Sequence, residues 1–216
     1  MTIEGEHALA RYVADAPPEK GNVRIRYMKK TKKAFMAAIV IVAIVGIWGS
    51  IWYKRHYPYG AAHICNKAMI LSLKMYANNH GGAYPTGESS PEASLSLLYR
   101  EGVMREPDQL AGKAADPKVA KKILESGALL GPENCNWHYE EGLTEADPAD
   151  VAVLWDKVPG LGHNCERIPD GGREVVFIGG MGSYIHGTNW PAFLDEQNQK
   201  LAEIKEKRTK RSEPTL

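Results

Sequence analysis

The 216-residue sequence has no charged residue between Ala34 and Tyr53, and the whole chain has a formal net charge of only +1. A protein that binds nucleic acid needs surplus positive charge to neutralise phosphate groups, so this balance argues against a nucleic-acid partner. Cysteine is also scarce, with three residues that all follow the uncharged run. Roughly 160 residues come after that run, which is enough for one domain with its own core.

Several motifs that carry chemistry are missing. No Asp-x-Asp-x-Asp run is present, which excludes an EF-hand, and no Cys-x-x-Cys-His supports covalent haem. The segment Gly179-Gly180-Met181-Gly182 lacks the G-x-G-x-x-G spacing of a phosphate-binding loop, so it predicts a hairpin turn. Neither Ser72 nor Ser183 lies in a G-x-S-x-G elbow. We identify no catalytic set and predict a protein that is not an enzyme.

The uncharged run itself, residues 34–53, predicts a transmembrane helix. Twenty helical residues span roughly 30 Å, the thickness of a bilayer's hydrocarbon core. The run from Ala34 has no polar face, which disfavours an amphipathic helix packed on a soluble core. Trp48, Trp52 and Tyr53 crowd its C-terminal end, where aromatic rings favour the headgroup level. A buried helix of a soluble protein and a cleaved signal sequence are the alternatives.

Basic residues are distributed unequally on the two sides of this run. Only Lys54 and Arg55 follow it directly. Six basic residues lie in the ten positions directly before it: Arg24, Arg26, Lys29, Lys30, Lys32 and Lys33. This bias predicts a single-pass membrane protein with a cytoplasmic N-terminus and an exported C-terminal domain. The same residues suit contact with anionic lipid. Signal peptides have a shorter apolar region of about 7–15 residues, so we expect the anchor to be retained.

The remainder of the chain predicts an α+β domain. Apolar spacing predicts a helix from His63, with Leu71 and Met75 packed against a sheet, and Pro58 interrupts the pattern before it. Further helices are expected over residues 91–101 and, behind an Asp116 N-cap, from Pro117 to before Gly127. Short strands are expected over residues 136–139, 151–155, 174–178 and 183–186. Helices first and strands later indicate an α+β class.

A charged helix over residues 192–208 and a basic tail end the chain. The helix has a narrow apolar stripe, which fits docking on the domain, docking on another subunit or a solvated face: Phe193, Leu194, Leu201 and Ile204. The predicted organisation is therefore a basic cytoplasmic arm (1–33), a transmembrane helix (34–53), an extracytoplasmic domain (54–191) and a charged helix with its tail (192–216).

Three segments carry a resemblance to a known family. They are residues 63–85, which contain Cys65, Tyr76 and a Gly-x-x-Pro sequence ending at Pro85, residues 131–139, and the closing stretch from residue 153 to 178. The residues that match the family pattern are Tyr76, Pro85, Trp155, Asp156, His163 and Phe177. The chain resembles the type IV pilin-like proteins, especially G-type pseudopilins and prepilin-like relatives of planctomycetes and verrucomicrobia, whose closing stretch carries a His-x9-Asp-Gly motif. The resemblance implies a membrane helix that continues into a helix packed on a small antiparallel sheet.

The chain also departs from that pattern. It has no glycine directly before the apolar run, where Lys33 stands, and no glutamate inside the run; these are the residues associated with prepilin processing and pilus assembly. Gly179-Gly180-Met181-Gly182 replaces the usual Asp-Gly-His-Val, and an insertion from Cys165 to Asp170 stretches the spacing. We therefore predict a structural or accessory subunit of an envelope membrane assembly, with other envelope proteins and lipid as partners. A genuine pseudopilin of a type II secretion or type IV pilus system is the alternative.

The three cysteines allow three disulfide pairings and leave one thiol over. The resemblance favours Cys65–Cys135. Cys135–Cys165 would close a smaller loop, and three reduced thiols are the remaining alternative. An oxidising compartment would allow a disulfide to persist.

No cofactor is expected, and a metal-binding or redox domain, with zinc or calcium as the metal, is a third hypothesis. Cys135, His138, His163 and Cys165 supply two thiolates and two imidazoles, the ligand types of a structural zinc site. Some pseudopilins hold calcium in an acidic loop, and the turn-rich second half of this chain contains Asp147, Asp150, Asp156 and Asp170. Aspartates in such sequence are also common turn formers.

Overall fold

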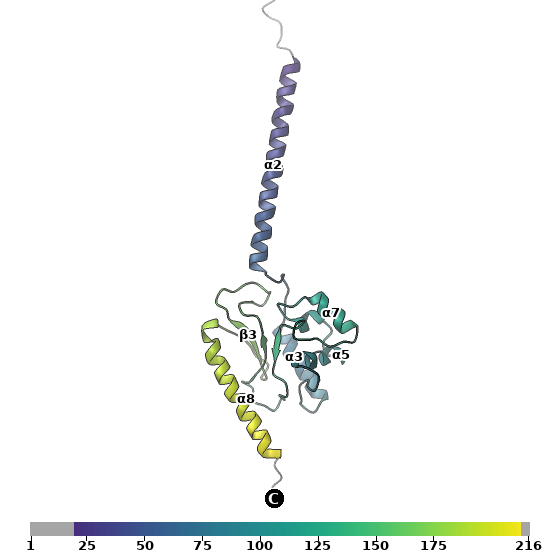
Figure 1. Ribbon diagram of the computed structural model, residues 1–216, viewed down its shortest axis with the longest axis vertical. Coiled ribbons are helices and arrows are strands. Elements are labelled where there is room, and N and C mark those ends of the chain that lie inside the picture. Colours follow the sequence, from purple (N-terminus) through teal and green to yellow (C-terminus); the bar gives the residue numbers. More distant parts are fainter. Residues whose placement is uncertain (1–19, 213–216) are drawn as a thin grey trace, which may run out of the picture. The chain divides into compact units, whose positions relative to one another are not determined.

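The chain forms a long N-terminal helix followed by an α+β domain (Figure 1). The computed structural model describes the backbone of residues 20–212 and the side chains of residues 33–210. Most of the predicted basic arm and the end of the predicted tail lie outside the described residues. The elements are α2 (Lys20–His56), α3 (Asn66–Asn79), α4 (Pro91–Leu95), α5 (Leu97–Arg100), α6 (Pro107–Ala111), α7 (Pro117–Glu125), β1 (Trp137–Tyr139), β2 (Ala152–Asp156), β3 (Arg173–Phe177), β4 (Gly182–Ile185), η1 (Gly187–Asn189) and α8 (Trp190–Ser212).

Helix α2 contains the predicted membrane span. Among the described residues, one helix is long and apolar enough to cross a membrane, over Lys33–His56, with a mean hydropathy of 2.5. The large apolar side chains from Phe35 to Tyr53 are all 45% to 73% exposed. The helix is therefore apolar on every face, as the sequence predicts. An amphipathic helix would instead bury one apolar face in a core. The chain divides into two units, residues 1–52 and 53–216.

Helix α2 ends at His56, and the chain is not helical again until Asn66. Proline at position 58 explains the stop, because its ring disfavours helical geometry in the residue before it. The Tyr57 amide still donates to the Tyr53 carbonyl at 2.8 Å, which completes the last helical turn. Helix α2 and the first helix of the domain are thus separate elements, whereas the resemblance implied one continuing into the other.

Helix α3 packs on the core through a different face from the one predicted. Leu71 and Met75 are 59% and 47% exposed, so their expected packing against the sheet is wrong. The buried stripe is Met69, Leu73 and Tyr76. Apolar residues lie on both sides of this helix, and two stripes of helical spacing were therefore available. The contacts with the rest of the domain select one of them.

In the helical half of the domain, capping residues and side-chain hydrogen bonds set where the helices begin and end. Asp116 caps α7 as predicted, and its carboxylate accepts from the Lys118 amide at 2.9 Å. The helix expected over residues 91–101 is divided at Ser96 into α4 and α5. The Ser96 hydroxyl donates to the Glu92 carbonyl and accepts from the Leu130 amide, and such side-chain bonds compete with helical ones. Helix α6 has five residues and was not predicted.

The second half of the domain is a four-stranded antiparallel sheet with the order β1-β2-β3-β4. Each strand lies within one residue of its predicted range. Residues 178–181 turn between β3 and β4, and Gly180 has a φ of +89°, which confirms the predicted hairpin turn. An irregularity between Ala152 and Leu154 shifts the register of β2. It leaves Ala152 and Trp155 together in the smaller core cluster and Leu154 in the larger one.

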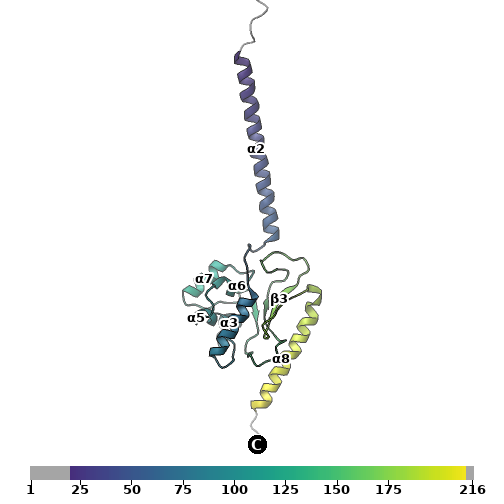
Figure 2. The same cartoon turned by 180° about the vertical axis from the view of Figure 1, so that it is seen from behind.

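Both faces of the sheet are covered. Helix α8 lies on one side, while α3, α5 and α7 lie on the other (Figures 1 and 2). Leu201 and Ile204 of the predicted apolar stripe are buried, so α8 docks on its own domain. The buried Gln197 amide exchanges two hydrogen bonds with the backbone of Ala152, at 3.0 and 2.8 Å. This side chain satisfies the backbone groups at the irregular point of β2.

Substitutions on the two faces of α3 test which face packs against the core. We expect Leu73→Ala to lower the free energy of unfolding by about 2–5 kcal/mol, because it leaves a cavity in a fully buried site. Leu71→Ala is the matched control on the same helix and should change stability by less than about 0.5 kcal/mol. Urea unfolding followed by tryptophan fluorescence measures both. Equal losses for the two variants would contradict the orientation of α3.

Candidate functional site

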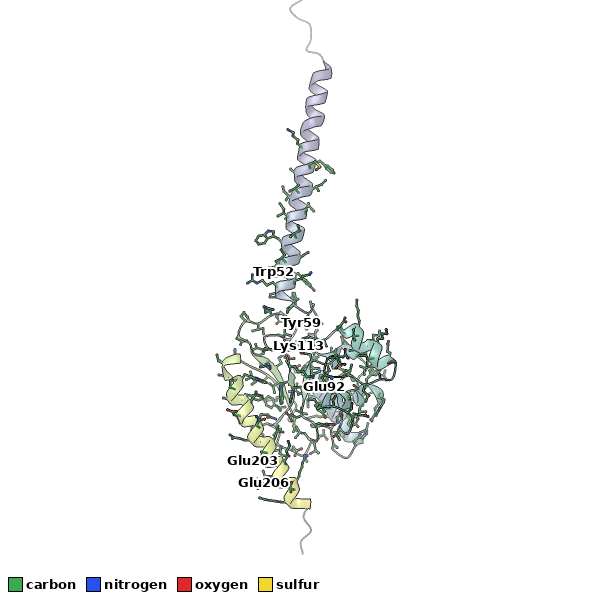
Figure 3. All side chains as sticks on the ribbon, viewed as in Figure 1. Trp52, Tyr59, Glu92, Lys113, Glu203 and Glu206 are labelled. Atoms are coloured by element: carbon green, nitrogen blue, oxygen red, sulfur yellow. The ribbon has the colours of Figure 1, made fainter. Side chains whose placement is uncertain are left out.

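A lysine is completely buried between the two halves of the domain. The Lys113 side chain is 0% exposed, and Figure 3 shows it within the body of the domain, whereas Glu203 and Glu206 project from α8. Its Nζ donates to Asp156 Oδ2 at 2.8 Å, to Glu174 Oε2 at 2.8 Å and to the Leu161 carbonyl at 3.3 Å. An ammonium group has three donors, and all three are used here. We call Lys113, Asp156 and Glu174 the Lys113 cluster.

Lys113 comes two residues after the end of α6. Hydrogen bonds on two sides of that helix hold it in place and so position the lysine. On one side, the Gln109 side chain accepts from the Cys65 amide and donates to the His63 carbonyl, which ties α6 to the start of α3. On the other, the Trp137 indole donates to the Gln109 carbonyl. Gly112 then turns the chain with a φ of +76°, in close contact with Trp137. Only glycine adopts this backbone conformation easily at so crowded a point.

The two carboxylates come from neighbouring strands. Asp156 ends β2 and Glu174 lies in β3, and the Glu174 amide donates to Asp156 Oδ2 at 3.1 Å. The Asp156 side chain is 0% exposed and that of Glu174 is 12% exposed. The antiparallel pairing of β2 with β3 therefore brings both acidic groups to one cation.

The charges of the cluster do not cancel when all three groups are ionised. Burial raises the pKa of Asp156 to about 6, although the Lys113 ammonium opposes this shift, and the nearby Glu174 carboxylate raises the pKa further. Among the described residues, no group hydrogen-bonds to the buried Asp156 Oδ1. A buried charge and an unpaired acceptor both cost free energy, so the protonated form of Asp156 is favoured more than in water.

Glu174 connects the cluster to the surface. Its Oε2 accepts from Asn66 Nδ2 at 2.7 Å and lies 3.7 Å from His163 Nδ1. These residues line an open pocket of about 420 Å³, whose other lining residues are His63, Cys65, Lys67, Gly182, Ser183 and Tyr184. The rings of His63 and His163 meet edge to face with centroids 4.3 Å apart. The pocket thus places the His163 imidazole beside a carboxylate that contacts a buried amine, and His63 packs against that imidazole.

The three cysteines are separate. All lie in the described part of the chain, and each is a free thiol, so none of the predicted pairings is formed in this structure. Cys135 Sγ donates to the Leu110 carbonyl at 3.2 Å, and burial raises its pKa to about 12. Cys165 is buried in a turn with a φ of +62°, and burial raises its pKa as well. Cys65 is half-buried before α3.

The predicted zinc ligands are not brought together. His138 stacks on Trp155 at a centroid distance of 4.1 Å and contacts Glu140 at 2.9 Å, while His163 lies in the pocket. No three His, Cys, Asp or Glu side chains within the described residues are placed to hold a metal ion. The four aspartates weighed for calcium have separate partners: Asp147 contacts Arg208, Asp150 contacts Lys200, Asp156 contacts Lys113, and Asp170 contacts Tyr184 and His186.

The six residues that match the family pattern divide into two groups. Asp156 and His163 belong to the cluster and its pocket. The other four make packing or backbone contacts: Tyr76 stacks on His80, the Pro85 carbonyl accepts from Tyr139, and Trp155 and Phe177 pack on Phe193 of α8. The sequence did not single out Lys113, Glu174 or Asn66. Lysine and glutamate are usually solvated, and no local pattern distinguishes these two from their exposed counterparts.

Comparison of the chain with protein-family models, with curated proteins and with solved structures finds no match. The pilin-like resemblance remains a prediction from the sequence.

Truncating the buried lysine tests how much the cluster contributes to the stability of the domain. We expect Lys113→Ala to lower the free energy of unfolding by about 3–5 kcal/mol, because it leaves buried carboxyl groups without their cation. Lys200 is the matched control, since its Nζ also lies between two carboxylates, 2.8 Å from Asp150 and 2.7 Å from Glu196, but both carboxylates are solvent-exposed and the lysine is only half-buried. Lys200→Ala should cost much less. Similar losses in urea unfolding would contradict this ranking.

Alkylation tests the state of the thiols. In the folded protein we expect iodoacetamide to label Cys65 and to spare Cys135 and Cys165, because these are buried and their pKa values are raised. After unfolding without reductant, all three should react, as peptide mass spectrometry would show. Cys65→Ser is the control that removes labelling of the folded form. A single reactive thiol after unfolding would instead establish a disulfide.

Proposed function

We propose that this chain is a non-enzymatic, single-span membrane protein whose pilin-like domain serves as a structural or accessory subunit of an envelope assembly. The observation that carries the proposal is the uniform exposure of the apolar side chains on α2. Water disfavours apolar surface by about 25 cal/mol per Å², so a helix of this kind needs a lipid environment or neighbouring helices around it. Lipid satisfies the requirement along the length of a bilayer.

The basic residues before the apolar run support one orientation. Six of them lie within residues 24–33, and two follow the run. By the positive-inside rule the N-terminus is cytoplasmic and the domain is periplasmic. The domain would then be the part of the protein that meets other envelope components.

The interior of the domain supports a structural role. Its buried polar side chains connect segments far apart in the sequence: Gln109 joins α6 to α3, Gln197 joins α8 to β2, and Lys113 joins the helical half to the sheet. Such satisfied buried bonds specify one arrangement of the elements. A domain held in this way presents a fixed surface to its neighbours.

A genuine pseudopilin is the second candidate. It is favoured by α3 packing on β3 of a small antiparallel sheet, the arrangement that the family resemblance implies. The missing glutamate in the apolar run argues against it. The two candidates differ in whether the N-terminus is cut before Ala34.

Membrane anchoring is tested by alkaline carbonate extraction of native membranes. The wild-type protein should stay in the membrane fraction. The double variant Val40→Asp, Ile44→Asp should leave it, because two central aspartates cost about 5–7 kcal/mol and each remaining Ile, Val or Phe contributes only about 0.3–0.6 kcal/mol. Leu71→Asp, Met75→Asp is the matched control, with two exposed apolar residues changed on α3. Extraction of the wild-type protein would contradict an anchor.

The kind of subunit is decided by purification in mild detergent, followed by intact-mass measurement of the chain and its companions. A chain that begins at Met1 and has stoichiometric membrane partners supports the accessory-subunit proposal. A chain cut before Ala34 that co-purifies with secretion components would establish the pseudopilin instead. A full-length chain without any companion would contradict both.

A further inference from the structure

The Lys113 cluster holds an amine against a carboxyl group in a dry environment. Lys113 Nζ lies 2.8 Å from Asp156 Oδ2, and the side chains of both residues are 0% exposed. A second carboxylate, Glu174, lies 2.8 Å from the same nitrogen. Exposed ion pairs of this chain resemble the cluster in distance but not in burial, and Lys200 with Asp150 and Glu196 is the closest counterpart.

Burial changes which protonation states are favoured. Transfer of one proton from the Lys113 ammonium to Asp156 converts two buried charges into a neutral amine and a neutral carboxylic acid, which a low-dielectric interior disfavours far less. The pKa of Asp156 is raised in the direction that this transfer requires. A neutral amine is a nucleophile, and a protonated carboxyl group can lose its hydroxyl as water. In that neutral state the two reactive groups would lie at contact distance, because Lys113 Nζ is 2.8 Å from Asp156 Oδ2.

We propose that Lys113 and Asp156 condense to form an intramolecular amide bond, with Glu174 as the proton relay. The bond joins Lys113 Nζ to Asp156 Cγ, and the bond from Cγ to one carboxyl oxygen breaks. Glu174 accepts a proton from the attacking nitrogen and delivers it to the departing hydroxyl, so that one water leaves and Glu174 ends as it began. No oxidant, reductant or other reactant is needed. This inference does not depend on the proposed membrane role.

The two carboxyl oxygens of Asp156 differ in their hydrogen bonds, which suits Oδ2 to remain as the amide oxygen and Oδ1 to leave as water. Oδ2 accepts from the Glu174 amide at 3.1 Å, and that donor stabilises negative charge on the oxygen while Cγ is tetrahedral. Oδ1 is buried with no hydrogen-bond partner among the described residues. Its departure as water would remove an unsatisfied acceptor from the core. The amide carbonyl that remains would keep the hydrogen bond already made by Oδ2.

The pocket gives the released water a route out. Glu174 contacts the buried amine and also lines the pocket with Asn66 and His163, and its side chain is 12% exposed. Water formed beside Glu174 is therefore adjacent to solvent. A condensation in a closed core becomes irreversible once the product water has left the site.

Intact-mass measurement of the full chain tests the proposal. The protein is purified from membranes in mild detergent, fully reduced and unfolded before measurement, so that disulfides do not contribute. We expect a mass lower than that of the sequence by one water, and a branched peptide in which the Lys113 and Asp156 segments are joined. Segments containing Lys200, Asp150 and Glu196 should remain separate and serve as the internal control.

Two variants identify the groups involved. Lys113→Met removes the nucleophile and should restore the full mass of its own sequence, whether or not the variant folds well. Glu174→Gln keeps the shape of the side chain but cannot relay the proton, and it should also have its full mass. A wild-type protein at full mass would overturn the amide bond. Loss of water in Lys113→Met would place the dehydration elsewhere, and loss in Glu174→Gln would overturn the relay.

Discussion

The burial of the Lys113 ammonium is the constraint on which the rest of the domain depends. A buried charge is tolerated only where every donor has an acceptor, and the acceptors here, on Asp156, Leu161 and Glu174, all lie more than forty residues after the lysine. The loop after α6, the end of β2 and the middle of β3 must therefore all be in place together. A slip of β3 by one residue would turn Glu174 to the other face of the sheet and leave the amine short of a partner. The register of the sheet and the position of the helical half are fixed by the same contact.

The opposite face of the sheet is covered by apolar packing and has no buried ion pair comparable to the Lys113 cluster among the described residues. There the core is small and apolar, and α8 covers it with Trp190, Phe193 and Leu194. The irregularity in β2 disturbs the regular pairing of Ala152, and the Gln197 amide supplies bonds to both its backbone groups. One buried polar side chain thus allows the irregular strand, and the irregular strand in turn directs Trp155 toward α8. The helix that the sequence left open between docking and solvation is a necessary part of the domain.

The fold and the site differ in how far the sequence could predict them. The strands were found because each is a short β-branched or aromatic run between turn residues, and α7 was found because Asp116 and Pro117 mark its start. These signals are local. The buried face of α3 was predicted wrongly because apolar residues flank both sides of that helix, and only distant contacts decide between Leu73 and Leu71. Lys113 was missed for a related reason, since its burial depends on carboxylates more than forty residues away.

The two parts of the chain differ in which side chains they bury and which they expose. In α2, apolar side chains are exposed along the whole span, and their stability depends on surroundings outside the chain. In the domain, charged groups are enclosed, and their stability depends on partners inside it. The first makes the helix suited to lipid, and the second makes the domain rigid around one point. An amide bond between Lys113 and Asp156 would carry this rigidity further, because the helical half and the sheet could then no longer separate while the covalent link persists. This link would require no bound ligand, because both of its groups come from the chain itself.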